Sequence, residues 1–151
     1  GIIGCGGIAN SKHMPSLRKQ PDVKLVAFCD IIEERAQKAL QDFGAEDAKS
    51  YTDYKELLKD KSIDIVHVCT PNREHSFITV DALEAGKHVM CEKPMAINGE
   101  EAQKMLDAAK RTGKKFNDRL PKPLPPGLLV FKSGPAMRAS WEKSTMRRHT
   151  R

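Results

Sequence analysis

The chain has 151 residues, of which 39% are hydrophobic and 30% are charged, and its formal net charge at pH 7 is +6. This length suits one domain with a substantial core, and no apolar run approaches the roughly 18 to 20 residues that a membrane-spanning helix needs. We therefore expect a single-domain cytoplasmic protein with no membrane partner. The charge does not indicate nucleic-acid binding, because residues 118–151 hold 8 Lys+Arg and 2 Asp+Glu, whereas residues 1–117 hold 18 of each.

The first nine residues predict a strand end, a glycine turn and a helix start. Gly4 permits the tight turn, Gly6 lets the backbone approach a pyrophosphate, and Ala9 lets the helix pack close to the strand. Backbone N–H groups at the helix start then face the anion. An ordinary strand-to-helix turn also uses glycine, so the motif needs its context. The predicted cofactor contacts here are Gly4, Cys5, Gly6, Gly7 and Ile8.

Residues 23–29 form the next predicted strand, which ends in Asp30. A carboxylate at this place can accept hydrogen bonds from both ribose hydroxyls of an adenosine, although it can also cap the following helix. Asp30 favours NAD over NADP because it repels a 2′-phosphate and Ile31 and Ile32 supply no cation. Arg35, one helical turn later, could reach that phosphate, so NADP stays an alternative.

The later elements alternate between helix and strand. Such alternation gives right-handed crossovers and a doubly wound parallel sheet, the Rossmann form of the α/β class. In that sheet ligands bind beyond the carboxyl ends of the strands, where the glycine turn, Asp30 and the loops at 70–72 and 92–94 all fall. The predicted helices are 8–19, 33–43, 52 or 53 to 58, 75–85 and 99–111, and the predicted strands are 23–29, 49–51, 63–69 and 87–91.

The four cysteines are far apart in the sequence, and none forms a C-x-x-C pair. Their spacing therefore predicts no structural metal site. Each follows or ends an apolar run, so we expect buried, reduced thiols near the carboxyl edge of the sheet. They are Cys5, Cys29, Cys69 and Cys91.

These motifs resemble the amino-terminal domain of the glucose–fructose oxidoreductase, inositol dehydrogenase and rhizopine-catabolism (Gfo/Idh/MocA) family of NAD(P)-dependent oxidoreductases. The resemblance covers residues 1–116. Its most specific part is Glu92-Lys93-Pro94, which a generic dinucleotide fold has no reason to carry. The other matching segments are 4–9, 29–30, 69–72 with His75, and 85–89.

The resemblance implies a role for Lys93 beside the nicotinamide and the substrate hydroxyl, where its cation positions and polarises the group being oxidised. A solvated loop lysine is the alternative. Glu92 and Asn72 would line the cofactor. His75 and His13 are weaker candidates, because a histidine at a helix start is more often a surface or packing residue. The implied cofactor-lining residues of these two loops are Thr70, Pro71, Asn72, His75, Glu92 and Lys93.

Full-length members of the family take their substrate pocket and a catalytic histidine from a second α/β domain, and the resemblance implies a sugar or polyol substrate and a homo-oligomer. That second domain is missing here, and no residue clearly replaces the histidine. We therefore expect this chain to bind the cofactor without full turnover; a non-catalytic nucleotide-binding module is the alternative. Because the chain begins at Gly1 without a methionine, we expect it to be a fragment of a longer protein.

Residues 117–151 differ in character from the rest. The segment 120–126 is too rich in proline to continue a sheet, and residues 144–151 are basic without an apolar period. Codons allowed for 117–127, read one base later, give TIGYQNRFRPD, and a shifted frame from Met137 through Arg147 permits AGELGEIYYA; both fit the family. We therefore expect a non-native or disordered, frameshifted tail, with a divergent linker as the alternative. DNA codons incompatible with these two readings would contradict the hypothesis.

Overall fold

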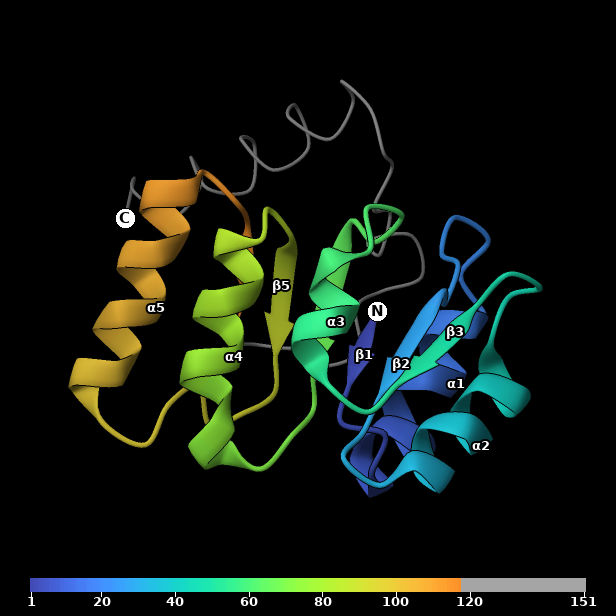
Figure 1. Ribbon diagram of the computed structural model, residues 1–151. Coiled ribbons are helices and arrows are strands. Elements are labelled where there is room, and N and C mark those ends of the chain that lie inside the picture. Colours follow the sequence, from blue (N-terminus) through green and yellow to red (C-terminus); the bar gives the residue numbers. More distant parts are fainter. Residues whose placement is uncertain (118–151) are drawn as a thin grey trace, which may run out of the picture.

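The computed structural model describes residues 1–117, which build one six-stranded sheet in the order β3-β2-β1-β4-β5-β6 (Figure 1). All five strand pairings are parallel. This is the doubly wound order that the alternating sequence pattern predicts, with the first strand in the middle. The strands are β1 (Ile2–Ile3), β2 (Ala27–Cys29), β3 (Lys49–Tyr51), β4 (Ile65–Val68), β5 (His88–Cys91) and β6 (Phe116–Asn117).

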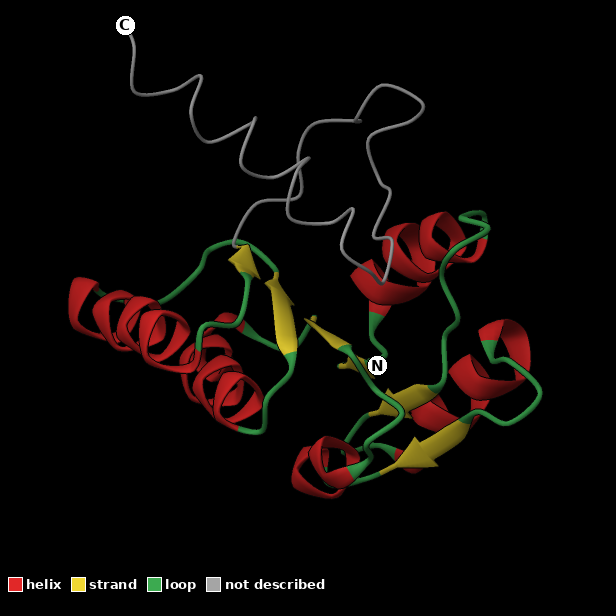
Figure 2. Ribbon diagram, turned by 90° about the horizontal axis from the view of Figure 1, so that it is seen from above, coloured by secondary structure: helices red, strands yellow, loops and turns green. Residues whose placement is uncertain are grey.

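Helices lie on both sides of the sheet, as the view from above shows (Figure 2). One apolar cluster joins β1 and β2 to the first three helices and includes Phe28 and Met14. A second cluster joins the opposite face to the last three helices and includes Val66, Leu83 and Met105. The helices are a π-helix η1 (Ala9–His13), followed by α1 (Met14–Arg18), α2 (Glu33–Phe43), α3 (Tyr54–Lys59), α4 (Asn72–Glu84) and α5 (Gly99–Thr112).

The predicted helix at 8–19 is present but opens with a wider π turn. The N–H of Met14 donates to the carbonyl of Ala9, five residues earlier. Pro15 follows directly, and it has no N–H with which to bond the preceding turn. The helix therefore begins as a π turn and becomes α-helical only at Met14, a change that hydrophobic periodicity does not reveal.

Two predicted strands are too long at their starts. The N–H of Val23 bonds to Gln20 in a turn, so β2 begins at Ala27. The N–H of Ile63 bonds to Asp60 in another turn, so β4 begins at Ile65. Leu25 and Ile63 are buried but precede the first paired residues of these strands, and an apolar run alone does not show where strand pairing begins.

The helix after β4 also differs from the prediction. It begins at Asn72 rather than at His75, because Pro71 sits at the N-cap with extended backbone. Proline has no N–H to satisfy, which suits a helix start. No helix in the described part of the chain is long and apolar enough to cross a membrane.

Candidate functional site

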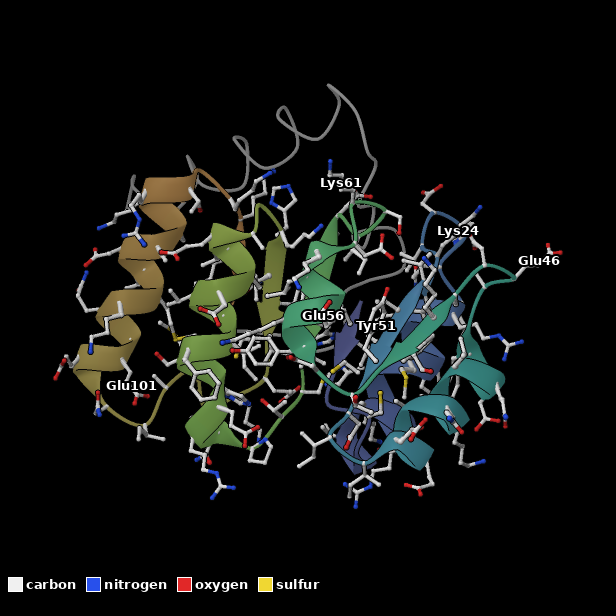
Figure 3. All side chains as sticks on the ribbon, in the orientation of Figure 1. Lys24, Glu46, Tyr51, Glu56, Lys61 and Glu101 are labelled. Carbon is white, nitrogen blue, oxygen red and sulfur yellow. The ribbon has the colours of Figure 1, made fainter. Side chains whose placement is uncertain are left out.

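The carboxyl ends of β1, β2, β4 and β5 carry the predicted site residues and meet at one edge of the sheet. Backbone hydrogen bonds fix their alignment: Gly4 N–H donates to Cys29 O, Cys69 N–H to Ile3 O, and Glu92 N–H to Val68 O. Figure 3 shows Glu101, in the first turn of α5, at this edge and Lys24 and Lys61 at the opposite one. The residues that follow these four strands therefore face one common region.

Gly4 is required by the fold itself. Its φ angle is 92°, in the region that residues with a side chain rarely adopt. A Cβ at Gly4 would lie 2.7 Å from the carbonyl carbon of Cys69 and 2.8 Å from Thr70 N, both of them backbone atoms that cannot move aside. The turn after β1 can therefore pass the end of β4 only if residue 4 is glycine.

Gly6 and Gly7 are not required in this way. A Cβ at either position would meet no atom within 4 Å, and neither has a positive φ. The space in front of them is open, and Gly7 and Ile8 are exposed. Residues 6 and 7 have no side chains, and no other part of the described protein fills the space beside them, so a ligand can approach the backbone closely. A pyrophosphate is the ligand that such a turn accepts.

The Asp30 carboxylate ties the glycine turn to the loop after β2. Its Oδ2 accepts the N–H of Cys5 at 2.9 Å, and its Oδ1 accepts the N–H of Ile32 at 2.9 Å. Asp30 is only 8% exposed. Each oxygen keeps a lone pair, so the carboxylate can still accept from ribose hydroxyls. The alternative role as a helix cap is wrong, because Ile32 is the N-cap residue of α2.

The loop after β4 presents Thr70, Pro71 and Asn72 at the same edge. Thr70 Oγ1 is buried and has no hydrogen-bond partner in the described part of the chain. A buried hydroxyl without a partner costs free energy, so a ligand hydrogen bond at this atom would be favourable. Pro71 and Asn72 are exposed, and Asn72 Oδ1 accepts the N–H of Arg73 at 3.1 Å.

His75 lies beneath these loops and is only 1% exposed. Its Nδ1 is 2.8 Å from Pro94 O, and its Nε2 is 2.8 Å from Thr70 O. The imidazole therefore bridges the loop after β4 and the loop after β5. In this arrangement its ring nitrogens face the protein backbone rather than the open edge.

Glu92 and Lys93 follow β5; the Glu92 side chain is mostly buried, whereas the Lys93 side chain is exposed. Glu92 is 12% exposed, and its Oε1 accepts a hydrogen bond from Nε2 of His13 at 2.6 Å. Its Oε2 accepts the N–H of Lys93 at 3.1 Å, while Lys93 itself is exposed. Glu92 thus holds the start of this loop against η1 and leaves the Lys93 side chain at the surface of the edge.

All four cysteines are buried and none forms a disulfide, as the sequence predicts. Burial, with the Asp30 carboxylate nearby, raises the pKa of the Cys5 thiol and of the Cys29 thiol to about 12 each. Burial likewise raises the pKa of Cys69. At neutral pH these groups are thiols and not thiolates, so none of the three is an activated nucleophile.

A hollow of about 290 Å³ lies elsewhere, between α2, the end of β3 and α3. Three carboxylates line it, those of Glu33, Asp53 and Glu56, together with Tyr51; Figure 3 shows Tyr51 and Glu56 in this region. None of the predicted site residues borders this hollow. Its carboxylates would repel a phosphate, so the site is better identified by the strand ends than by this concavity.

Two site residues were underrated or missed by sequence reasoning. His13 was only a weak candidate, and its bond to Glu92 joins residues 79 positions apart in the sequence, which no local spacing signals. Asn10 lies within the predicted helix 8–19 and was not among the candidate site residues, yet its Nδ2 donates to Gly6 O at 3.0 Å and stiffens the glycine turn. Asn three residues after the glycines was the available signal.

Comparison with known proteins gives a family match over residues 1–117 to the oxidoreductase family with an NAD-binding Rossmann fold (Gfo/Idh/MocA). The chain is 40% identical over 117 residues to inositol 2-dehydrogenase of Salmonella paratyphi B, covering 77% of this chain and 34% of that protein. It is 42% identical over 113 residues to D-glucoside 3-dehydrogenase of Escherichia coli, covering 75% and 32%. The chain thus spans about a third of the length of these relatives.

Solved structures of related proteins share the fold of this domain. The WlbA dehydrogenase of Chromobacterium violaceum in complex with NADH and UDP-GlcNAcA superposes with a TM-score of 0.71 at 34% identity, over 76% of this chain and 32% of that one. KijD10, a 3-ketoreductase of Actinomadura kijaniata in complex with NADP, gives a TM-score of 0.70 at 29% identity, over 75% and 34%. Residues 1–117 form the NAD-binding Rossmann domain, and the chain belongs to the Gfo/Idh/MocA oxidoreductase family.

Proposed function

We propose that this chain binds NAD(H) across the carboxyl edge of its sheet and forms the cofactor-binding part of a dehydrogenase for a sugar or polyol hydroxyl. The observation that carries the proposal is the glycine turn: Gly4 is required by the packing, whereas Gly6 and Gly7 face open space that the protein leaves unfilled. The pyrophosphate would lie there against the N–H groups of residues 5–8, with the adenosine ribose on Asp30.

The nicotinamide end of the cofactor would lie toward the loops after β4 and β5. Thr70 Oγ1 is available as a hydrogen-bond partner there, and Asn72 and Lys93 are exposed at the same edge. The bound cofactor supplies a ring that accepts a hydride from an alcohol carbon. The Lys93 cation would orient the alcohol oxygen and stabilise the negative charge that develops as its proton leaves.

We further infer a preference for NAD over NADP. The Asp30 carboxylate is held rigidly by two backbone N–H groups, so it cannot swing away from a 2′-phosphate. Residues 31 and 32 are isoleucines that are exposed beside it and supply no positive charge. A phosphate at this place would therefore be repelled and left without a charged partner.

Titration of the purified 151-residue chain with NADH and with NADPH, followed by nicotinamide fluorescence, tests both proposals. We expect saturable NADH binding and weaker NADPH binding. Asp30→Ser should weaken NADH binding and reduce the ratio of NADH affinity to NADPH affinity. Asp22 is an exposed carboxylate in the turn before β2, and Asp22→Ser should change neither the NADH affinity nor this ratio. NADPH binding tenfold tighter than NADH binding would overturn the preference, and no binding of either would overturn the site.

A non-catalytic nucleotide-binding module is the second candidate. The observation that favours it is the state of His75, because both of its ring nitrogens contact backbone carbonyl oxygens and neither faces the open edge. Here we propose that the chain alone binds cofactor without completing turnover. An assay of the chain with NAD and a panel of polyols and sugars separates the two, since reduction of NAD above the blank by this chain alone excludes the non-catalytic module.

A further inference from the structure

A buried cluster of two imidazoles and a thiol lies on one face of β4. His67 and Cys69 are two residues apart, so their side chains share a face of the strand, and His13 reaches them from η1. One ring nitrogen of each histidine and the Cys69 Sγ lie within 4.8 Å of one another. The exposed fractions are 6% for His13, 3% for His67 and 7% for Cys69.

His67 is the residue of the cluster that most needs a partner. Neither its Nδ1 nor its Nε2 has a hydrogen-bond partner within the described residues, and both atoms are buried. A neutral imidazole carries one lone pair on a ring nitrogen, and in His67 no described group uses it. Leaving such a group unpaired inside a protein costs free energy. A neutral imidazole is also the form that binds metal ions.

His13 is arranged as metal-binding histidines usually are. Its ring lies 4.4 Å from that of His67, centroid to centroid, and its Nε2 contacts Glu92 Oε1 at 2.6 Å. A histidine that binds a metal through one ring nitrogen commonly donates the other N–H to a carboxylate, which orients the ring and makes it a better ligand. Glu92, at 12% exposed, supplies that carboxylate.

We propose that His13, His67 and Cys69 form a site for a divalent cation of the zinc type. Two imidazoles and a thiolate are a donor set that Zn²⁺ and Co²⁺ accept in tetrahedral geometry, with water as the fourth ligand. Metal–ligand bonds of about 2.0 to 2.3 Å require the donor atoms to draw together by roughly 1 Å, within the reach of small side-chain rotations.

Binding of the cation would release one proton from the cluster. The Cys69 thiol loses one proton to solvent, its sulfur forms a bond to the cation, and each imidazole donates a lone pair without losing a proton. The dication and one thiolate leave a single positive charge, which faces the Glu92 carboxylate. Because Glu92 also accepts the N–H of Lys93, an occupied site would fix the loop that carries Lys93 against η1.

Cobalt titration of the metal-stripped 151-residue chain tests the proposal. We expect a thiolate-to-cobalt charge-transfer band and tetrahedral ligand-field bands that saturate at one equivalent of Co²⁺ and disappear on addition of Zn²⁺. Cys69→Ser should abolish the charge-transfer band, and His67→Gln should weaken Co²⁺ binding by at least tenfold. Cys29→Ser is the matched control, because Cys29 is also a buried strand thiol but lies outside the cluster, and it should keep the full signal.

Circular dichroism of each variant first establishes that it is folded. Titration of the unaltered chain does not depend on any variant: absence of a thiolate–cobalt band at one equivalent would overturn the proposal. A band of full intensity in folded Cys69→Ser would overturn it equally, because the sulfur would then come from another cysteine. Neither result bears on NADH binding, which is measured separately at the glycine turn.

Discussion

Gly4 and Gly6 are two residues apart, yet the structure places opposite demands on them. Gly4 has a left-handed backbone and touches the backbone of Cys69 and Thr70, whereas Gly6 faces open space. The fold therefore requires glycine at position 4, whereas at position 6 glycine serves the proposed approach of the ligand. The sequence analysis separates these roles, with the turn at Gly4 and the pyrophosphate approach at Gly6, but it does not reveal the clash at Gly4, which comes from the end of a distant strand.

Alanine at each position should separate folding from binding. Gly4→Ala should destabilise the domain by about 1 to 3 kcal/mol or prevent folding, from backbone strain and the forced contact with residue 69. Gly6→Ala should change stability by less than about 0.5 kcal/mol but weaken NADH binding at least tenfold, because its methyl group fills the space meant for pyrophosphate. Urea unfolding and NADH fluorescence measure the two effects. Equal NADH affinity for Gly6→Ala and the unaltered chain would contradict this assignment.

The histidine at position 88 should make the stability of the fold depend on pH. Its Nδ1 accepts the N–H of Lys115, a bond that requires the neutral ring. Burial lowers the pKa of His88 below its ordinary 6.5, and the positive charges of Lys114 and Lys115 lower it further, while Asp64 acts in the opposite direction. Below pH 6.5 the unfolded chain therefore binds a proton here that the folded chain does not, so stability falls as the pH falls.

Urea unfolding at pH 7 and pH 5 checks this prediction. His88→Asn keeps an acceptor for the Lys115 N–H but cannot titrate, so it should show a smaller loss of stability between these pH values than the unaltered chain. Equal losses for the two proteins would mean that other groups account for the acid sensitivity. The comparison isolates His88 because every other titrating group is the same in both proteins.

Helix α4 shows what one element does for the site. It begins at the cofactor edge and carries His75, whose ring nitrogens contact Thr70 O and Pro94 O. The loops after β4 and β5 are thus attached to one rigid helix. Neither loop has regular structure of its own, and both hold predicted site residues, so the helix positions these residues through His75.

Replacing His75 should loosen both loops. His75→Leu removes both contacts, so amide hydrogen exchange at residues 92–97 should speed up, and stability should fall by about 1 to 3 kcal/mol. Phe77→Ala is a control on the same helix, because Phe77 is 49% exposed and does not bridge the loops. Unchanged exchange at 92–97 in folded His75→Leu would show that the loops are held by other contacts.

Elements with a strong local signal could be predicted from the sequence, and contacts between distant elements could not. The helix at 33–43 was predicted with its observed bounds, because its apolar residues repeat with helical spacing and Gly44 ends it. The π turn of η1 and the early start of α4 depend on single prolines at 15 and 71. The His13–Glu92 bond and the partnerless His67 depend on which side chains the folded sheet brings together.

At the scale of the whole molecule, cofactor binding should raise the melting temperature. The proposed cofactor would touch loops from both halves of the sheet, so it binds the folded domain and not the unfolded chain. At 100 times its dissociation constant, NADH would stabilise the fold by about 2.7 kcal/mol. Differential scanning fluorimetry with and without NADH measures this, with Gly6→Ala as the control that should show little shift. No shift at saturating NADH would contradict the proposed site.

The predicted boundary between the domain and the tail stays a hypothesis. The family match ends at residue 117, and the proposed change of reading frame lies in 117–151, of which 118–151 are outside the described residues. We propose that the DNA of this region restores a family-like sequence when the frame is shifted. Sequencing the gene across these codons is decisive, because codons that exclude the two alternative readings would refute it.

The central place of β1 has a consequence for the order in which the nascent chain can fold. Strand β1 leaves the ribosome before both of its neighbours, and it pairs on one side with β2 and on the other with β4, which is synthesised much later. Until β4 emerges, the growing chain exposes an open parallel edge of apolar residues, and such edges invite pairing with other chains. The half of the sheet on which we propose that adenosine binds is thus synthesised before the half on which we propose that nicotinamide binds. Stalling translation between α3 and β4 would therefore leave a half-sheet that depends on chaperones to stay unaggregated.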